Sequence, residues 1–258
     1  MAALMAPRAD RLIDASDGTP EHVWLPWLEQ QRLPTVAPDL LVLPGQRAVM
    51  VAPHPDDEVL AVGGLWSQLA RLGRVLCLIA LTDGGASHPR STLWPPQRLA
   101  TERPRETEAA LAALGAASTL VRRLQFDDGG LAHASERLSA SIAALLQPGD
   151  VLFTTWRLDG HPDHDATGAA CATAARDANA TLVEVPVWTW HWATPNDARV
   201  PWQRAHRIVL DPAAVQRKQA ALQAFASQLT PDASTGEPAV LRPSIVQRAL
   251  RPFEIVLR

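Results

Sequence analysis

The chain has 258 residues, of which 47% are hydrophobic and 20% charged, and its formal net charge is −3. This composition is typical of a globular chain with a substantial core, and the length suits one large α/β domain. The lack of a basic excess argues against nucleic acid as a partner and gives no support to membrane-surface binding, and no apolar run approaches the roughly 20 residues that span a bilayer.

The first 45 residues contain scattered prolines and a tryptophan pair, Trp24 and Trp27, without a clear helix or strand period. We expect residues 1–45 to be an N-terminal extension that packs on the rest of the chain through these tryptophans. Residues 46–258 are expected to form one domain.

Apolar runs and helical periods alternate through this domain. Strands are expected at residues 48–52, 74–81, 119–126, 151–156, 182–190, 207–210 and 253–257, and helices at residues 59–72, 104–114, 135–146, 165–176 and 213–229. Such alternation predicts an α/β fold with a Rossmann-like, mostly parallel sheet and helices on both faces.

Both cysteines, Cys77 and Cys171, stand in apolar or alanine-rich surroundings and are expected to be buried, reduced thiols. Two cysteines do not make the disulfide scaffold of a small secreted protein. Arg8, Asp10 and Arg11 have no apolar stretch beside them that would form a signal peptide. We therefore expect a cytoplasmic protein.

Two clusters of histidine and aspartate each follow an expected strand, at residues 53–58 and 159–165. Open α/β sheets bind ligands beyond the carboxyl ends of their strands, so both clusters stand where chemistry is expected. Imidazole and carboxylate groups are zinc ligands, and a catalytic zinc site uses three protein ligands and leaves one position open. Either cluster alone could be explained by Asp57 or Asp165 capping a helix. Two such clusters at equivalent strand ends favour a shared metal site.

The segment Ala52-Pro53-His54-Pro55-Asp56-Asp57-Glu58, with Gly63-Gly64 after it, resembles a signature of the LmbE-like/PIG-L family of zinc-dependent N-acetylglucosaminyl deacetylases. The segment Asp159-Gly160-His161-Pro162-Asp163-His164 resembles the second signature of that family. Weaker agreements are Thr82-Asp83-Gly84, Arg103 with Glu106, Asp128-Gly129-Gly130-Leu131, and Lys218, Ser227-Gln228 and Phe253-Glu254. The similarity covers about residues 45–258, and the N-terminal extension has no counterpart in it.

The resemblance implies that His54, Asp57 and His164 bind one Zn²⁺ per chain, although such ligands also accept other divalent metals. A water on the ion would be the nucleophile, because zinc lowers the pKa of bound water toward about 7. Asp56 would act as the general base. His161 would act as an imidazolium that stabilises the oxyanion and passes a proton to the departing amine.

Three further residues have a functional and a structural interpretation. Asp163 would orient an imidazole in the second shell of the metal, or cap a helix. Arg103 and Asp128 match family positions that contact sugar hydroxyls; alternatively they are a solvated arginine and a turn-forming aspartate. Because Pro104 suits the first turn of a helix, we expect Arg103 at the mouth of that helix.

The segment Trp188-Thr189-Trp190-His191-Trp192 closes the expected strand 182–190. Alternate side chains of a strand share a face, and tryptophan stacks well on sugar rings. These tryptophans either fill the core or line the substrate cleft. We expect one of them in the cleft, with Trp190 and His191 as candidate substrate contacts.

The leading functional hypothesis is hydrolysis of an N-acetyl group from an N-acetylglucosamine-type sugar or glycoconjugate, which makes the partner a small molecule or glycoconjugate. A second hypothesis is zinc-dependent cleavage of another N-acyl or thiol-conjugate substrate. A third is a non-catalytic module with a structural ion, although structural zinc sites are usually closed and rich in cysteine. A nucleotide binder is disfavoured because Gly63-Gly64 does not complete a Gly-x-Gly-x-x-Gly turn. The extension would cover one side of the cleft, and a homo-oligomer is left open.

Overall fold

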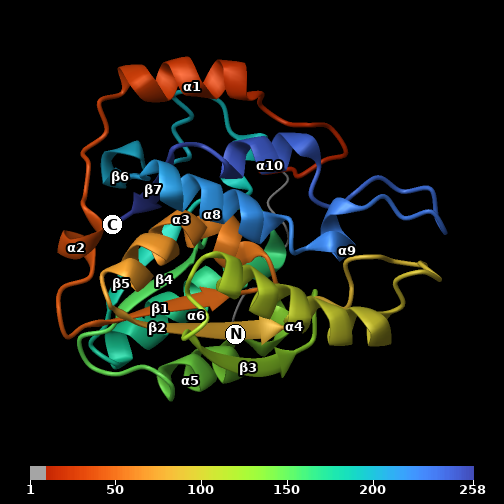
Figure 1. Cartoon of the computed structure of the whole chain (residues 1–258), viewed down its shortest axis with the longest axis horizontal. Coiled ribbons are helices and arrows are strands. Elements are labelled where there is room, and N and C mark those ends of the chain that lie inside the picture. The colour runs from red at the N-terminus through yellow and green to blue at the C-terminus, as the bar shows by residue number, and fades with distance from the viewer. Residues whose placement is uncertain (1–9) are drawn as a thin grey trace.

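The strands that carry the site are apolar along nearly their whole length, as is typical of strands covered on both faces. The computed structural model describes residues 10–258 and contains a seven-stranded sheet in the order β3-β2-β1-β4-β5-β7-β6 (Figure 1). The strands are β1 (Arg47–Ala52), β2 (Val75–Thr82), β3 (Leu120–Phe126), β4 (Val151–Thr155), β5 (Thr181–Val185), β6 (Ala205–Val209) and β7 (Phe253–Leu257). Strands β1 to β5 are parallel, while β7 pairs antiparallel with both β5 and β6.

Alternate residues of β1 bury against helices on opposite faces of the sheet. Met50 belongs to a core cluster with residues of α3 (Asp57–Arg71), α4 (Pro96–Ala113) and α8 (Pro212–Leu222). Val49 belongs to another cluster with residues of α5 (Ser135–Ala143) and α6 (Pro162–Asp177). The expected mostly parallel sheet with helices on both faces is therefore confirmed.

The strand order reverses between β1 and β4. From β1 the chain moves outward to β2 and β3, and it then returns to place β4 on the other side of β1. Loops that leave two such strands diverge, which opens a crevice at their carboxyl ends. The first histidine cluster follows β1 and the second follows β4, so both border this crevice.

The N-terminal extension covers the β6–β7 edge of the sheet. Helix α1 (Glu21–Gln30) lies across the top of the molecule in Figure 1, and its Trp24 ring packs edge-on against Trp190, with centroids 5.1 Å apart. Trp24 Nε1 also donates to the Trp190 carbonyl at 3.0 Å. A further short helix, α2 (Pro38–Leu41), leads into β1. Residues 1–9 of the expected extension lie outside the described residues.

Several expected elements differ from the structure because of proline. The helix expected at residues 104–114 begins at Pro96, which occupies its first turn, and Pro104 is accommodated inside it. The strand expected at residues 182–190 ends at Val185, because Pro186 has no N–H for the ladder. The chain then forms α7 (Thr189–Trp192), so the tryptophans do not alternate on a strand.

The helix expected at residues 213–229 is also divided. Helix α8 ends at Leu222, and a separate turn, α9 (Ala226–Leu229), follows it. Helix α10 (Pro243–Ala249) was not expected from the sequence. Two 3₁₀ helices, Leu131–Ala134 and Trp202–Arg204, complete the elements of the described residues.

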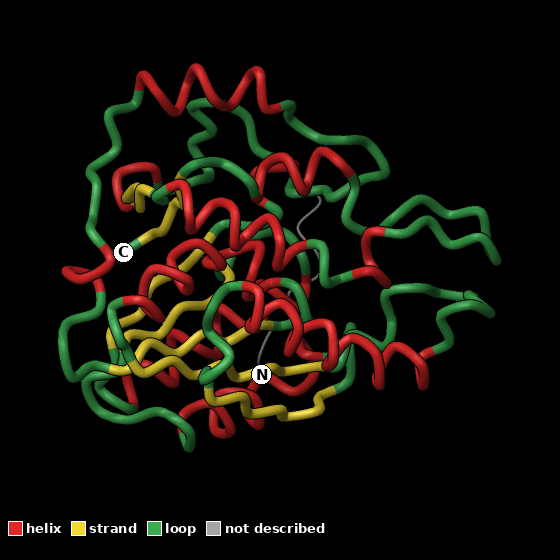
Figure 2. The backbone as a smooth tube through the Cα atoms, in the orientation of Figure 1, coloured by secondary structure: helices red, strands yellow, loops and turns green. Residues whose placement is uncertain are grey.

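Two long loops, residues 83–95 and 230–242, protrude from the same end of the molecule (Figure 2). They contact each other where the Ser91 and Ser234 hydroxyls lie 3.2 Å apart and the Thr92 N–H donates to Ser234 Oγ at 3.1 Å. These two loops therefore lie together beside the carboxyl ends of the parallel strands.

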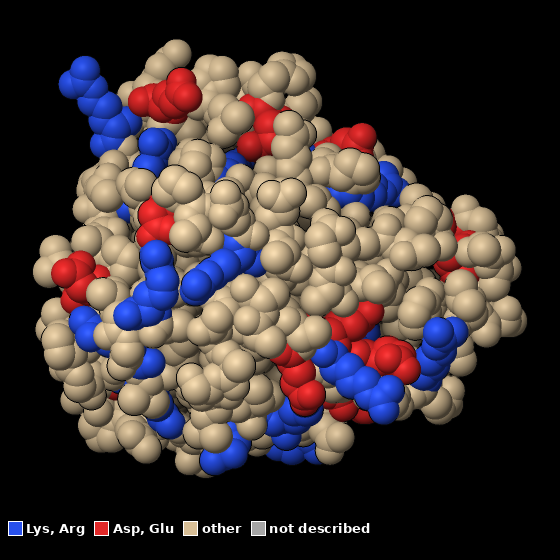
Figure 3. Space-filling model, viewed as in Figure 1, with Lys and Arg blue, Asp and Glu red and all other residues tan. Residues whose placement is uncertain are grey.

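Both cysteines are buried and free, as expected from the sequence. Acidic and basic side chains are interspersed on the face of the molecule shown in Figure 3. Among residues 10–258, no helix has the length and apolar character needed to cross a bilayer.

Candidate metal centre

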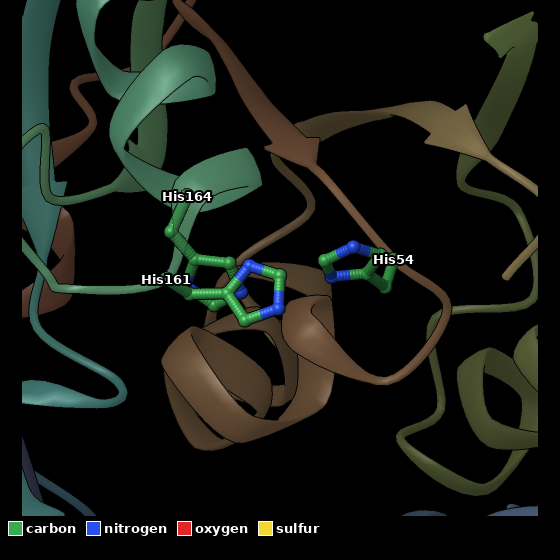
Figure 4. Close-up of side chains that lie close together, drawn as sticks. All are labelled: His54, His161 and His164. Atoms are coloured by element: carbon green, nitrogen blue, oxygen red, sulfur yellow. The ribbon is translucent and has the colours of Figure 1, made fainter. Parts of the chain in front are cut away.

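Three histidines face one another at the carboxyl ends of β1 and β4 (Figure 4). His54 lies in the turn between β1 and α3, whereas His161 and His164 lie at the start of α6. One nitrogen from each ring falls within 4.8 Å of the other two. The two loops singled out by the sequence therefore meet, although they are more than 100 residues apart.

Asp57, the first residue of α3, lies between two of these rings. One carboxylate oxygen is 3.2 Å from His54 Nδ1, and the other is 3.3 Å from His164 Nε2. Although burial alone would raise the pKa of Asp57, the neighbouring His164 and His54 hold it well below its usual range. The carboxylate is thus ionised between two imidazole nitrogens, which places Asp57 in contact with both of the other predicted ligands.

The opposite nitrogen of His164 is bound by Asp159, a residue that sequence reasoning missed. His164 Nδ1 lies 2.9 Å from Asp159 Oδ2. The same carboxylate accepts the backbone N–H groups of Val187, Trp188 and Thr189 at 2.9–3.0 Å. Because Asp159 acts as an acceptor toward all of these groups, His164 Nδ1 carries a proton and Nε2 points into the centre.

His54 is held in the same manner by two carboxylates. Its Nε2 lies 3.2 Å from both Asp163 and Asp128. Asp163 also accepts the backbone N–H groups of Gly129 and Leu131, at 2.8 and 3.2 Å. These three side chains form a second group with donor atoms within 4.8 Å of one another. Because Asp163 already serves backbone donors, it suits the outer side of His54 and leaves Nδ1 to face Asp57.

The donor set fits a divalent ion. Among the described residues, His164 Nε2 is buried and makes no hydrogen bond of regular geometry, although an Asp57 oxygen lies 3.3 Å from it. An orphaned buried nitrogen is costly unless a ligand or ion satisfies it. Neutral imidazole and carboxylate are the donors that zinc accepts in open catalytic sites.

Asp56 has an unusual backbone conformation between these ligands. Its φ of 114° lies in a region that side chains rarely adopt, and its N–H donates to Glu58 Oε2 at 3.0 Å. Such backbone strain is typical of functional sites. Burial raises the pKa of Asp56 to about 8, even though the Arg103 guanidinium opposes the shift.

Arg103 lies in the interior of α4 and is only 3% exposed. Its Nη2 is 3.1 Å from Asp56 Oδ2 and also donates to the Pro55 carbonyl, while Nη1 donates to the Gly84 carbonyl at 3.0 Å. The expectation that Arg103 stands at a helix mouth was wrong, because α4 starts further upstream. The side chain braces the turn that carries Asp56.

His161 caps α6, and its Nδ1 accepts the Asp163 N–H at 3.3 Å. Its Nε2 is therefore the nitrogen that carries a proton in the neutral ring. Burial and the neighbouring His164 and His54 lower the pKa of His161 to about 3. A neutral imidazole is thus favoured over the imidazolium expected from the sequence.

The segment that contains both histidine clusters is similar to a known protein family. Residues 49–175 match the model of the PIG-L family, described as GlcNAc-PI de-N-acetylase. This chain carries a PIG-L family domain. Both histidine clusters fall inside the matched range.

The PIG-L domain resembles one curated relative and several solved structures. The relative is the 1D-myo-inositol 2-acetamido-2-deoxy-alpha-D-glucopyranoside deacetylase of Rhodococcus erythropolis, 28% identical over 175 residues. That match spans 58% of this chain and 59% of the relative, so it covers less than two thirds of the relative's length.

Two solved structures share the fold of the PIG-L domain. The zinc-inhibited form of teicoplanin deacetylase has a TM-score of 0.58 at 18% identity, covering 72% of this chain and 85% of its own. The deacetylase of A40926 pseudoaglycone has a TM-score of 0.60 at 24% identity, covering 82% and 96%.

Motif residues outside the metal centre, some of them C-terminal to the matched range, stabilise the packing of α3. Glu254 accepts the Gly64 and Leu65 N–H groups at 2.8 and 2.9 Å and pairs with Lys218 Nζ at 2.7 Å. A Cβ on Gly64 would approach a Leu210 methyl to 2.3 Å. The Gly63-Gly64 motif therefore allows close packing of α3, the helix that begins with Asp57 of the metal centre.

The tryptophan segment beside the PIG-L domain requires a correction. Trp190 is 7% exposed and packs in the tryptophan core, with its indole N–H bound to the Pro186 carbonyl at 2.9 Å, so most of its surface is used inside the protein. Trp188 is the residue near the centre, where its ring stacks on His161 with centroids 6.4 Å apart. His191 is a neighbour of Trp188 and borders a cavity.

Proposed function

We propose that this chain is a metal-dependent hydrolase that removes the N-acetyl group from an N-acetylglucosamine-type sugar or glycoconjugate. The carrying observation is the orphaned Nε2 of His164, held toward Asp57 and His54 and next to the buried acid Asp56. The PIG-L family domain and the N-acetyl sugar deacetylase among its relatives support the substrate class.

We assign His54 through Nδ1, Asp57, and His164 through Nε2 as the ligands of one divalent ion. Each histidine has its other nitrogen engaged by a carboxylate, which presents the remaining lone pair inward. Zinc suits this mixed set, and when bound it supplies a Lewis acid that lowers the pKa of water toward neutrality. His161 is left as a non-ligand within reach of the reacting carbonyl.

Asp56 is the general base in this proposal. Its carboxylate takes a proton from the attacking water as oxygen adds to the acetyl carbon, and it returns that proton to the nitrogen as the C–N bond breaks. Burial raises the pKa of Asp56 to about 8, which suits an acid that must both take and give a proton near neutral pH. Arg103 positions Asp56 rather than the substrate, since its Nη groups are used inside the protein.

His161 stabilises the oxyanion as a hydrogen-bond donor. The ring is neutral, and its Nδ1 is occupied by the Asp163 N–H, so Nε2–H is the donor that remains for the carbonyl oxygen. One donor of this kind typically contributes about 10²–10³ in rate. Asp128 stays a predicted contact for the sugar, and the cytoplasmic location stays a prediction from the sequence.

The experiment measures acetate release and metal content together. Zinc-loaded protein is incubated with N-acetylglucosamine, a glycoside of it, and a panel of other N-acyl conjugates. The proposal expects acetate only from the N-acetyl sugars and loss of activity with a chelator. Turnover restricted to non-sugar conjugates would establish the amidase alternative, and absence of turnover in zinc-loaded, folded protein would refute the hydrolase.

Variants separate the ligands from the other site residues. Asp57→Ala and His164→Ala are expected to lose the bound metal, whereas His161→Ala keeps it. Metal retention in Asp57→Ala together with loss in His161→Ala would show that the three histidines form the ligand set instead.

A further inference from the structure

A cavity of about 400 Å³ opens next to the metal centre. Trp188 lines it, and the same ring stacks on His161. Ser87 also lines it, one residue after Ala86, whose N–H donates at 2.7 Å to the Asp128 carboxylate beside His54. The cavity therefore adjoins the proposed catalytic residues. Its volume lies in the range of small-molecule sites, roughly 300–1,000 Å³.

One wall of the cavity belongs to residues 13–19, which we call the N-terminal strap. The strap lies outside the residues that match the PIG-L family. Arg242 and Arg248 donate to its backbone carbonyls, and Ser244 Oγ donates to a strap carboxylate at 3.0 Å. The strap also donates a backbone N–H to the His191 carbonyl at 3.0 Å. These contacts make the strap a fixed wall.

Gly18 shows how closely the strap approaches the domain. It has a positive φ of 64°, and a Cβ there would lie 2.5 Å from the His191 carbonyl oxygen. Only glycine satisfies both conditions without strain. The conformation of the strap is thus built into the sequence of the extension.

The charged groups around the cavity are largely engaged within the protein. Asp14 accepts the Ser16 N–H at 2.8 Å and lies 3.3 Å from His191 Nε2. Asp232, on the loop of residues 230–242, accepts the N–H and hydroxyl of Ser234 at 2.8 and 2.7 Å. The other charged residues of the lining include Arg90 and Glu237, which are exposed and opposite in sign, so the cavity presents no strong excess of either charge.

The lining mixes polar side chains, among them Ser16, His88 and Thr235, with an apolar patch that includes an aromatic ring. Ile13 of the strap, Val240 and Ile245 line the same cavity as Trp188. Aromatic faces bind other flat rings in offset or edge-on arrangements, and aliphatic side chains complete such a pocket by excluding water. The lining therefore favours a flat, uncharged group.

We propose that this cavity receives an uncharged aromatic substituent carried by the amino sugar, and that Ile13 of the strap determines this specificity. The inference rests on the proposed N-deacetylase function and deepens it, because it names the part of the substrate that lies beyond the sugar. The extension then selects aryl-substituted N-acetyl sugars over simple ones.

The test compares the affinities of phenyl and methyl N-acetyl-β-glucosaminide by calorimetry. The titrations use zinc-loaded protein carrying Asp56→Asn, so that neither ligand is consumed. We expect the phenyl glycoside to bind about tenfold more tightly than the methyl glycoside, from burial of the ring. In Ile13→Asp this ratio is expected to fall to about one, because a charge replaces the apolar wall.

The control is Leu12→Asp, which adds the same charge one residue away on a side chain that is 65% exposed and does not line the cavity. It should keep the tenfold ratio. Ile13→Ser, which removes the apolar side chain without adding charge, should lose it, and thermal unfolding verifies that each variant is folded.

The outcomes distinguish the two levels of the proposal. Equal affinities for the two glycosides in the parent protein, or a ratio that survives in both Ile13 variants, would overturn the assignment of the cavity alone. Binding of neither glycoside would overturn the N-acetyl sugar substrate class and the inference with it. A tenfold ratio without acetate release from the protein that retains Asp56 would leave the cavity assigned and refute the deacetylase.

Discussion

Replacement of Asp159 by Asn should weaken metal binding without any direct contact with the ion. Asp159 Oδ1 accepts the Val187 N–H, the Thr189 N–H and the Thr189 hydroxyl, while Oδ2 accepts from Trp188 and His164 Nδ1. An asparagine has only one acceptor oxygen. Because three donors meet Oδ1, the amide NH₂ would take the Oδ2 position and face His164.

This replacement reverses the tautomer of His164. With an NH₂ group opposite it, Nδ1 must accept a hydrogen bond, so the proton of the neutral ring moves to Nε2, where it blocks the proposed ligand atom. Loss of such a second-shell partner typically weakens metal affinity by about 10–100-fold, which corresponds to about 1.4–2.8 kcal/mol. The same range is expected here, since Asp159 is the carboxylate that contacts Nδ1 of this ring.

The assay is competition for zinc between the protein and a chelating dye, with circular dichroism to verify the fold. Asp165→Asn is the matched control: Asp165 accepts the Gly160 N–H at 2.9 Å and has no hydrogen bond to a His164 ring nitrogen. Its zinc affinity should stay within about threefold of the parent. An unchanged affinity in folded Asp159→Asn would refute the argument that Asp159 sets the ligand nitrogen.

Three other predictions concern the centre and its support. His161→Ala should retain zinc in metal analysis while kcat for acetate release falls by about 10²–10³, and unchanged kcat would remove His161 from the reaction. Although burial opposes it, contact with neighbouring carboxylates raises the pKa of His164 to about 9 in the metal-free protein. Although burial opposes it, hydrogen bonds to Asp128, Asp163 and Asp57 likewise raise the pKa of His54 well above its usual value. The ion must therefore displace protons from these two ligands at pH 7, so zinc affinity measured by titration should rise by about tenfold to a hundredfold per pH unit between pH 6.5 and 8.5, and a flat profile would contradict this. Gly64→Ala places a methyl group against Leu210 and should lower the free energy of unfolding by about 1–3 kcal/mol in urea denaturation, whereas Gly85→Ala, with no neighbour closer than 3.7 Å, should change it by less than about 0.5 kcal/mol.

The parts of the fold that were predictable are those in which local pattern and packing agree. The apolar run of β1 predicts a buried strand with a histidine and aspartate cluster at its carboxyl end, and β4 with its cluster repeats the same pattern. Parallel strands meet at one edge of a sheet, so the proximity of His54 and His164 followed from the strand assignment.

Other features depend on contacts that no local pattern encodes. The start of α4 at Pro96 rather than Pro104 placed Arg103 in the interior, where it reaches Asp56 from another element. Asp159 was overlooked because its partners are backbone N–H groups after β5, which leave no trace in the sequence near it. The only local signal was an aspartate directly before Gly160, at the turn that follows a buried strand.

The tryptophans illustrate the same limit. Trp188 and Trp190 are two residues apart and would share a face in a strand, but Pro186 ends β5 and the short α7 turns them in different directions. Trp190 joins the core with Trp24 of the extension, and Trp188 stacks on His161. The change of chain direction after β5 therefore determines that Trp188, and not Trp190, lies next to His161.

The central claim is that a single divalent ion binds between the loops after β1 and β4. Anomalous scattering at the zinc absorption edge, from crystals of zinc-loaded protein, tests it most directly. We expect one peak per chain, within about 2.0–2.2 Å of His54 Nδ1, an Asp57 oxygen and His164 Nε2. A peak bound instead by His54 Nε2, Asp128 and Asp163, or no peak in the centre, would contradict the account.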